Sequence, residues 1–253
     1  MTVQSFYDGF AARYHLIYED WDASVARQGA ALDALFREHF PGARVVVDVA
    51  VGIGTQGLGL RMLGYQVIGS DLSFAAVRRA AGEAEQRDVP LPLYVADFQR
   101  LPLPTGGANV IVCCDNALPH LPSPRAIRAT LQEWYRCLRA GGGCLVSMRD
   151  YGEPPPPGTV EEHPYGERSW NGHRYALRQV WTWNGPRYDV ALTMTALDDN
   201  SPPLPAIATS YLAISTSQVL QLMQKAGFQD VRRIDGRFFQ PVLVGFKRAI
   251  SEE

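Results

Sequence analysis

Three glycines and a nearby acidic residue form the first group in this sequence that could do chemistry. Gly52, Gly54 and Gly57 make a GxGxxG pattern directly after an apolar run, and this spacing lets backbone approach a ligand closely at a helix N-terminus. Asp71 ends the next apolar run, where a carboxylate can accept hydrogen bonds from ribose hydroxyls. Nicotinamide dinucleotides and S-adenosylmethionine are both bound in this way, and a tight turn without a ligand is the alternative.

Two further acids extend this group. Asp48 lies four residues before Gly52 in an otherwise apolar run, where a buried carboxylate is costly unless it is paired or linked to a ligand. Asp97 closes the segment VADF, and it could accept a hydrogen bond from an adenine amino group while Phe98 lies against the ring. A turn-capping role for Asp97 is the alternative.

Polar residues also follow two later apolar runs. Asn116 comes after ANVIVCCD and Arg149 ends GCLVSMRD, which places both at the carboxyl edge of a parallel sheet, where ligands bind. Asn116 could contact a substrate or begin an Asx turn. His120 could orient a substrate or accept a proton, or be a structural hydrogen-bonding group. The Arg149 guanidinium suits a planar carboxylate, and an ion pair with Asp150 or Glu153 is the alternative.

Alternating strands and helices position these residues, which predicts a parallel sheet with both faces covered. A triple glycine at 141–143 predicts the end of the helix before the last of these strands. The expected helices are 2–18, 24–39, 55–63, 73–87, 122–139 and 215–226, and the expected strands are the runs ARVVVDVAVGIG, YQVIGSDL, LPLYVADF, ANVIVCCD and GCLVSMRD, with 229–235 and 240–247.

The pattern changes after residue 150. A proline-rich loop at 153–158 precedes a stretch, 160–198, that alternates polar and apolar residues. Asn-Gly pairs at 171–172 and 184–185 predict hairpin turns between antiparallel strands, and a second loop follows at 201–205.

Composition excludes several classes of protein. The chain has 253 residues, 24 basic and 26 acidic side chains and a formal net charge of −2. Without a block of like charge, nucleic acid is not an expected partner. No apolar run approaches the roughly 18 residues that span a bilayer, and the N-terminus has no signal pattern. We expect a cytoplasmic protein with a small-molecule substrate and no membrane partner, and leave a homo-oligomer open.

Cysteine and histidine spacing predicts neither a disulfide framework nor a metal site. No cysteine pair has CxxC spacing, and the histidines lack ligand spacing. The residues concerned are Cys113, Cys114, Cys137, Cys144, His15, His39, His120, His163 and His173.

The segment VVDVAVGIGTQGLGLRMLGYQVIGSD at 46–71 resembles the cofactor loop of class I S-adenosylmethionine-dependent methyltransferases. CDNALPHL at 114–121, SMRDYG at 147–152, QVWTWNG at 179–185 and FFQPVLV at 238–244 resemble the glycine/sarcosine N-methyltransferase-like group. The similarity runs nearly end to end. Val51 is a departure, because many relatives carry Cys or another residue before GIGTQ.

The resemblance implies S-adenosyl-L-methionine as the cofactor. Arg27 would bind the carboxylate of its methionine part, with Tyr7 and Tyr14 closing over it, since electron-rich rings suit a sulfonium cation. A solvated helix face and a packed aromatic stripe are the alternatives. The implied cofactor-binding residues are Tyr7, Tyr14, Arg27, Asp48, Gly52, Gly54, Thr55, Gln56, Asp71, Leu72, Asp97, Phe98 and Asp115.

The same resemblance gives candidate residues for the acceptor. Tyr211 lies in a segment like the family's TRYR stretch, and relatives that act on glycine use an arginine at the position of Arg149 for the amino-acid carboxylate. The catalytic candidates are Asn116, His120 and Tyr18, and the substrate-binding candidates are Asn116, Arg149, Tyr151, Trp183 and Tyr211.

The aromatic residues of the inserted segment have two interpretations. They could form a second small core or an aromatic substrate pocket, and strand alternation places Trp181 and Trp183 on one face. The other members are Trp170, Tyr175 and Tyr188.

We therefore expect one α/β domain over 1–253, with a Rossmann-like, mostly parallel seven-stranded sheet whose last strand is antiparallel. Residues 1–40 would form a helical lid and 151–212 an antiparallel substrate cover. The leading function is methylation of an amine nitrogen in an amino-acid-like substrate. The alternative is C-methylation of an aromatic such as an indole in natural-product biosynthesis. A nicotinamide-dependent oxidoreductase and a silent cofactor-binding scaffold are rivals of other classes.

Overall fold

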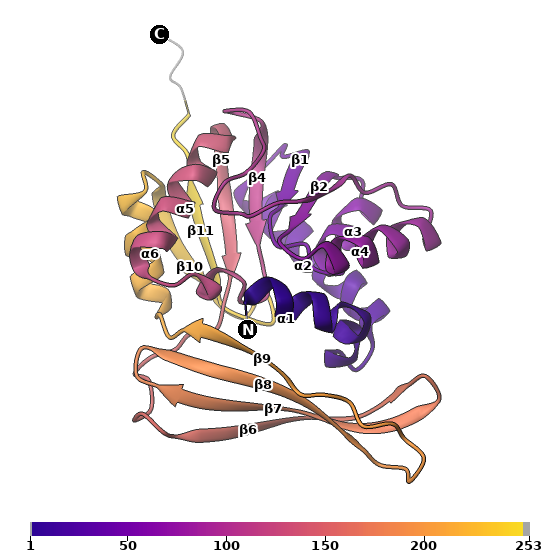
Figure 1. The fold of residues 1–253 in the computed structure, drawn as a ribbon. Helices are drawn as coiled ribbons and strands as arrows, with labels where there is room; N and C mark the ends of the chain where they lie inside the picture. Colours follow the sequence, from indigo (N-terminus) through magenta and orange to yellow (C-terminus); the bar gives the residue numbers. More distant parts are fainter. Residues whose placement is uncertain (1, 250–253) are drawn as a thin grey trace.

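The computed structural model describes residues 2–249. Its centre is a seven-stranded sheet of order β10-β11-β5-β4-β1-β2-β3 (Figure 1). β11 runs antiparallel to both of its neighbours and the other pairs are parallel. The predicted mostly parallel sheet with an antiparallel last strand is therefore confirmed. The strands are β1 (Val45–Asp48), β2 (Gln66–Asp71), β3 (Leu93–Val95), β4 (Ala108–Cys113), β5 (Leu138–Ser147), β10 (Gln229–Ile234) and β11 (Val242–Phe246).

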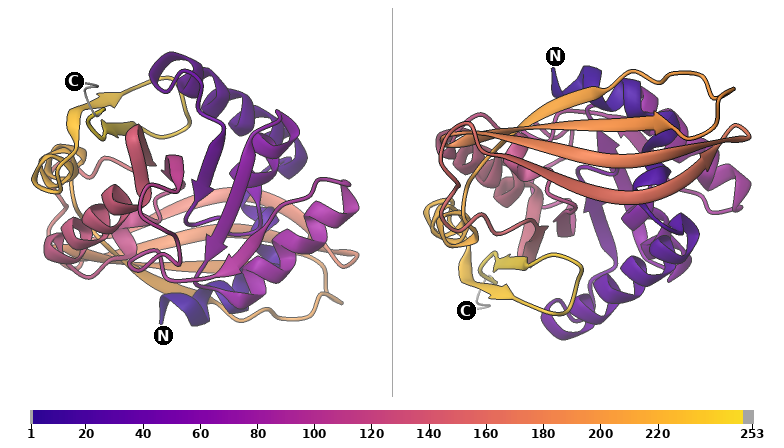
Figure 2. Two further views of the ribbon diagram at one scale, coloured as in Figure 1. Left: turned by 90° about the horizontal axis from the view of Figure 1, so that it is seen from above. Right: turned by 90° about the horizontal axis from the view of Figure 1, so that it is seen from below.

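Helices cover both faces of this sheet (Figure 2). Alternate residues of β1 and β4 face opposite sides, so Val46 and Val110 pack with α2 while Val47 and Ile111 pack with α5. Burial on both faces explains why these strands read as unbroken apolar runs. The helices are α1 (Val3–Phe10), α2 (Trp21–His39), α3 (Thr55–Met62), α4 (Phe74–Gln86), α5 (Pro124–Cys137) and α6 (Thr216–Lys225), with 3-10 segments η1 (Ala11–Ile17) and η2 (Leu118–His120).

Two glycines allow α2 to pack closely against α3. A Cβ atom on Gly59 would lie 2.5 Å from the Val25 carbonyl oxygen, and one on Gly29 would lie 2.7 Å from Gly59. This contact brings Gln28 to Gln56, whose Nε2 donates to Gln28 Oε1 at 2.7 Å. The start of α3, next to the glycine turn, is thereby fixed against α2.

A second, fully antiparallel sheet is inserted between β5 and α6. Its strands, in order, are β6 (Val160–Trp170), β7 (His173–Asn184), β8 (Arg187–Ala196) and β9 (Ile207–Leu212). It lies across the carboxyl ends of the central strands, with α1 between the two layers (Figure 1). Phe6 and Phe10 of α1 share a core with Tyr175 and Leu177 of β7. Some of the inserted aromatics thus form the predicted second core.

Two local predictions were wrong. α5 ends at Cys137 and Leu138 already has extended dihedrals, so 141–143 lies inside β5 and does not end the helix. Crowding explains two of these glycines, because a Cβ on Gly142 or on Gly143 would lie 2.4 Å from a neighbouring strand's carbonyl oxygen, whereas Gly141 has φ +76°.

The second hairpin turn is shifted by one residue. Asn184 pairs with Arg187, so the turn residues are Gly185 and Pro186. Its side chain instead donates to Asp189 Oδ2 at 3.1 Å. The other predicted turn, at 171–172, is confirmed, and both of its residues have positive φ.

The four cysteines are buried free thiols. Within residues 2–249, no helix is long and apolar enough to cross a bilayer.

Candidate active site

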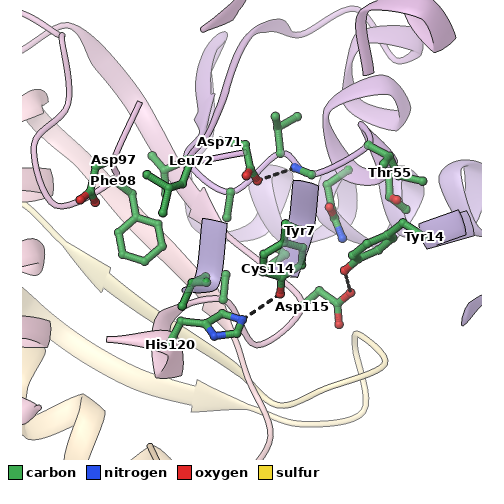
Figure 3. Close-up of a pocket in the computed structure, with 18 of the residues that line it drawn as sticks. Tyr7, Tyr14, Thr55, Asp71, Leu72, Asp97, Phe98, Cys114, Asp115 and His120 are labelled. Atoms are coloured by element: carbon green, nitrogen blue, oxygen red, sulfur yellow. Dashed lines mark hydrogen bonds between the residues drawn. The ribbon is translucent and has the colours of Figure 1, made fainter. Parts of the chain in front are cut away.

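Three adjoining cavities lie between the central sheet, the N-terminal helices and the second sheet. The first, the edge cavity, lies at the carboxyl ends of β1, β2 and β4 (Figure 3). Of the predicted site residues, those that line it are Tyr7, Tyr14, Tyr18, Gly52, Thr55, Gln56, Asp71, Leu72, Asp97, Phe98, Asp115 and His120.

Two further cavities open beside it. The arginine cavity is lined by Arg27, Arg149, Tyr18, Tyr165, Asp115, Gln240 and their neighbours. The aromatic chamber is lined by Phe6, Tyr7, Phe10, Tyr14, Ile17, Asp115, Asn116, Arg149, Tyr165, Gln179 and Tyr211.

The glycine turn presents bare backbone to the edge cavity. Gly52 has φ +54° and Gly54, at the N-terminus of α3, has φ +102°, values that L side chains adopt only with strain. A Cβ atom on Gly52 would meet nothing within 4 Å. Asp71 ties this turn to the end of β2, since its Oδ2 accepts from the Gly52 N–H at 2.9 Å and its Oδ1 from the Ser73 N–H at 2.9 Å. Burial raises the pKa of the Asp71 carboxyl.

An apolar slot with one carboxylate forms one end of the edge cavity. Leu72, Asp97 and Phe98 lie together there, away from Tyr14 and Thr55 at the other end (Figure 3). Asp97 Oδ1 accepts from the Gln99 N–H at 2.8 Å, so it does cap a turn. Its exposed carboxylate still faces the cavity.

Asp48 lies behind the glycine turn and does not line the edge cavity. Its Oδ1 accepts from the Ala50 N–H at 3.3 Å, and its Oδ2 has no hydrogen-bond partner among the described residues. Burial raises the pKa of this carboxyl to about 7. A much larger share of this carboxyl is therefore protonated near pH 7 than in an exposed aspartate, which lowers the cost of burying it.

His120 connects the N-terminal helices to the second sheet. Its Nδ1 donates to the Ser210 carbonyl at 3.3 Å, which leaves Nε2 to accept from the Tyr7 hydroxyl at 2.8 Å. The ring also lies against Tyr211, with centroids 4.1 Å apart. Burial lowers the pKa of His120 to about 4, so the imidazole is neutral near pH 7.

Asp115 and Asn116 turn sharply at the end of β4, and both have positive φ. The Tyr14 hydroxyl donates to Asp115 Oδ2 at 3.1 Å. The Asn116 side chain is fully engaged, because its Oδ1 accepts from the Arg149 N–H at 3.1 Å and its Nδ2 donates to the Tyr151 hydroxyl at 2.8 Å. Asn116 thus ties the ends of β4 and β5 together, although it also lines the aromatic chamber.

Arg149 forms no ion pair within residues 2–249. Its guanidinium lies over Trp181, 4.6 Å from the ring centroid, and Nη1 donates to the Tyr188 hydroxyl at 3.3 Å. Asp150 pairs with Arg233 instead, so the ion pair considered for Arg149 does not form. A partly buried cation with no carboxylate partner faces two cavities.

The comparisons with known proteins agree with this geometry. A family model described as "Methyltransferase domain" matches residues 46–142. The glycine/sarcosine N-methyltransferase of Parasynechococcus marenigrum (strain WH8102) is 32% identical over 149 residues, which cover 58% of this chain and 52% of the relative. Glycine N-methyltransferase of Homo sapiens is 29% identical over 159 residues, covering 57% and 53%. The chain spans about half the length of the curated relatives it matches.

Two solved structures share the fold over most of the chain. DesVI of Streptomyces venezuelae matches with a TM-score of 0.75 at 18% identity, over 95% of this chain and 97% of that one. The sugar N-methyltransferase KedS8 from Streptoalloteichus sp. matches with a TM-score of 0.76 at 18% identity, over 93% and 92%. Residues 46–142 match a methyltransferase domain, and together with the curated relatives and the shared fold this match supports a class I S-adenosylmethionine-dependent methyltransferase. The family resemblance of 46–71 is thereby confirmed.

The three cavities fit S-adenosyl-L-methionine, the cofactor of class I methyltransferases. The open space over Gly52 accepts a ligand against bare backbone. Asp71 offers acceptors for hydroxyl groups, the slot at Leu72 and Phe98 offers apolar surface, and Asp97 offers an acceptor for an amino group. These are the groups that an adenosine requires.

Not every predicted site residue lines the edge cavity. Arg27 lies in the arginine cavity, where its Nη2 donates to Ser24 Oγ at 2.8 Å. Trp183 stacks on Tyr188 and, with Tyr151, lines none of the three cavities. Trp181 and Trp183 share one face as predicted, with centroids 6.3 Å apart.

The site also has lining residues that the sequence analysis did not identify. Tyr165 and Gln179 face the aromatic chamber from β6 and β7. No motif marks Tyr165, because alternating strand positions look alike, whereas Gln179 begins the QVWTWNG motif, which could have identified it. Phe238, Phe239 and Gln240 line the arginine cavity. They belong to the FFQPVLV motif, which was the signal available.

Proposed function

We propose that this protein is a cytoplasmic enzyme that transfers a methyl group from S-adenosyl-L-methionine to an amine nitrogen of a small, amino-acid-like acceptor. Arg149 carries the proposal. A guanidinium that lacks an ion-pair partner and faces cavities beside the cofactor pocket fits a carboxylate of the acceptor. The N-methyltransferase relatives support an amine acceptor, and the free buried thiols support a reducing compartment.

The cofactor would lie along the edge cavity. Asp71 would accept from the ribose hydroxyls, and Leu72 and Phe98 would enclose the adenine, with Asp97 accepting from its amino group. The remaining contacts would come from the glycine turn and its helix and from the lid: Tyr7, Tyr14, Tyr18, Arg27, Gly52, Thr55 and Gln56. Gly54 lines neither cavity and would act by shaping the turn before α3.

When bound, this cofactor supplies a methyl group on a positively charged sulfur, which leaves as a neutral thioether. The chain's own residues would hold the acceptor in line and exclude water. Asn116 would fix the position of Arg149 through its backbone N–H. His120, neutral near pH 7, would hold Tyr7 over the reacting groups.

The N-terminal helices and the inserted sheet would act as lid and cover. Their support is that α1 packs on β9 and that Tyr7 and Tyr14 bond to His120 and Asp115 of the central domain. A lid of this kind keeps the methyl donor away from water.

The test is methyl transfer from isotope-labelled S-adenosylmethionine to an acceptor panel, with products identified by mass spectrometry. The panel holds glycine, sarcosine, dimethylglycine, tryptophan, simple indoles and tryptophan-containing cyclic dipeptides. We expect label on an amine nitrogen of the carboxylate-bearing acceptors. Label confined to an indole ring would contradict the proposal.

A second candidate is methylation of an aromatic carbon. The aromatic chamber favours it, because Phe6, Phe10, Tyr165 and Tyr211 surround a space next to Asp115 and Arg149. An indole would fit such a lining, and its ring N–H would need an acceptor as charge develops. The same panel distinguishes the two candidates by the position of the label.

A further inference from the structure

Asp115 lies where the three cavities meet. It is the residue that lines the edge cavity, the arginine cavity and the aromatic chamber alike. Its neighbours each line two of them: Tyr14 and Tyr7 join the edge cavity to the chamber, and Arg149 joins the chamber to the arginine cavity. An acceptor held by Arg149 that reaches toward the edge cavity must therefore pass Asp115.

Two consecutive residues with left-handed backbone place this carboxylate. Asp115 has φ +55° and Asn116 has φ +62°, a conformation that is uncommon for residues other than glycine and that Asp and Asn tolerate best. Ser147 holds the turn, since its Oγ accepts from the Asp115 N–H at 2.9 Å and its carbonyl accepts from the Asn116 N–H at 3.0 Å.

One carboxylate oxygen of Asp115 remains available. The Tyr14 hydroxyl donates to Oδ2 at 3.1 Å, and the Tyr18 hydroxyl lies 3.5 Å from the same oxygen. Oδ1 receives no hydrogen bond from residues 2–249, and it is not among the enclosed, partnerless oxygens of that part of the chain. A ligand in the cavities can therefore reach it.

The oppositely charged side chains of Asp115 and Arg149 face the same space but do not form an ion pair with each other. Both face the arginine cavity and the aromatic chamber, yet no N···O distance between them is within 4.0 Å. Opposite charges in a poorly solvated site attract strongly, so a gap between them suits a ligand that bears both charges. An α-amino acid has a carboxylate and an ammonium separated by one carbon.

We propose that Asp115 Oδ1 binds the ammonium of a zwitterionic acceptor whose carboxylate is held by Arg149, and that it takes one proton from that ammonium before methyl transfer. This inference rests on the proposed function. As the proton moves to Oδ1, the electron pair of the broken N–H bond stays on nitrogen as a lone pair. That lone pair then forms the bond to the methyl carbon, while the electrons of the broken C–S bond stay on the departing sulfur. Asp115 returns its proton to solvent after the product leaves.

The local electrostatics support a proton acceptor at this position. Burial raises the pKa of the Asp115 carboxyl, and Arg149 opposes the rise. The carboxyl therefore has more affinity for a proton than an exposed aspartate, which helps it compete for the ammonium proton. The phenols of Tyr14 in η1 and of Tyr18 directly after η1 face it, and burial raises the pKa of both, so they stay protonated as donors.

The test is Asp115→Asn, with Asp115→Gly as a second variant. Asn and Gly both tolerate positive φ, so the turn is retained.

Binding of glycine and of glycolate to the S-adenosylhomocysteine complex is measured by calorimetry, because glycolate carries a hydroxyl in place of the amine. We expect the native enzyme to prefer glycine at least about tenfold, and both variants to lose this preference. The turnover rate should fall about 100-fold, in the range of a lost general base, while S-adenosylhomocysteine affinity stays within about threefold of the native value.

Asp97→Asn is the matched control, because Asp97 lines the edge cavity and neither of the other two cavities. We expect it to weaken S-adenosylhomocysteine binding and to leave the glycine preference intact. If Asp115→Asn gives that same pattern, Asp115 is a cofactor contact and the inference is overturned. If the native enzyme labels amines but Asp115→Asn retains both turnover and preference, the inference alone fails. If the native enzyme labels no amine at all, the proposed function fails and this inference fails with it.

Discussion

The two walls of the edge cavity are held together in different ways. On the sheet wall, the bonds that shape the site are local: Asp71 binds Gly52, 19 residues away, and Ser73, two residues away. On the lid wall they join distant segments, because Tyr7 and His120 are 113 residues apart and Tyr14 and Asp115 are 101 apart (Figure 3). The part of the sheet wall around the glycine turn forms with β1, α3 and β2, whereas the lid wall forms only when the N-terminal helices meet the residues that follow β4.

Under the proposed function, the two walls would have distinct tasks. Backbone turns and short-range carboxylate bonds form a rigid surface for a cofactor that all family members share. Long-range side-chain bonds can break and form again as a lid opens. Changes to the lid wall should therefore affect ligand binding and turnover more than folding.

The largest expected effect comes from Arg149→Met. Removing one partner of a desolvated charge pair costs about 2–5 kcal/mol, so kcat/KM for a carboxylate-bearing acceptor should fall roughly 30-fold to several thousand-fold. S-adenosylhomocysteine affinity, measured by calorimetry, should change little. Arg149→Lys is the control, because it retains the charge but not the two-pronged geometry, and it should recover part of the loss. An Arg149→Met enzyme with unchanged kcat/KM would show that the acceptor's carboxylate lies elsewhere.

The sheet wall could be predicted from the sequence because its interactions are local. The GxGxxG spacing and Asp71 identified the turn, and the unbroken apolar runs identified the strands. Two details were wrong. Gly142 and Gly143 satisfy crowding by neighbouring strands, and the second hairpin turns at Gly185 and Pro186. No single stretch of sequence contains the distant strand that crowds a glycine.

The lid wall could not be derived in this way. Nothing in the spacing of Tyr7 or Tyr14 indicates that one meets His120 and the other Asp115. Only the resemblance to a known family placed these residues near the cofactor. The pairing of Asp150 with Arg233, which leaves Arg149 without a carboxylate, likewise joins residues 83 apart.

The pH dependence of the free energy of unfolding provides a second contrast between the two walls, with contributions of about 3–4 kcal/mol. The pKa of His120 on the lid wall falls from 6.5 to about 4, so its contribution is present above pH 6.5 and is lost as the pH falls toward 4. The pKa of Asp48 behind the sheet wall rises from 3.8 to about 7, so its contribution is present below pH 3.8 and is lost as the pH rises through 7. Because one pKa unit corresponds to about 1.36 kcal/mol, the largest contribution to the free energy of unfolding is about 3 kcal/mol for His120 and about 4 kcal/mol for Asp48.

Urea unfolding of His120→Gln and Asp48→Asn between pH 4 and pH 7 measures these slopes separately. Relative to the native protein, His120→Gln should gain stability as the pH falls, and Asp48→Asn should gain stability as the pH rises. Parallel slopes in the two variants would mean that the walls do not differ in their titrating groups.

The smallest expected effect is that of Tyr7→Phe, which removes the hydroxyl that bonds to His120. A hydrogen bond of this kind contributes about 1 kcal/mol, so S-adenosylhomocysteine affinity should fall about fivefold if the bond forms mainly in the closed, ligand-bound lid. The melting temperature without ligand should change little, because the phenyl ring keeps the packing of Tyr7 against Phe6 and Tyr14. Tyr94→Phe is the control, since Tyr94 on β3 is 54% exposed and lines none of the three cavities. If Tyr7→Phe lowers the melting temperature and leaves the affinity unchanged, then the lid wall is a fixed part of the fold, and the contrast between the two walls is one of sequence distance alone.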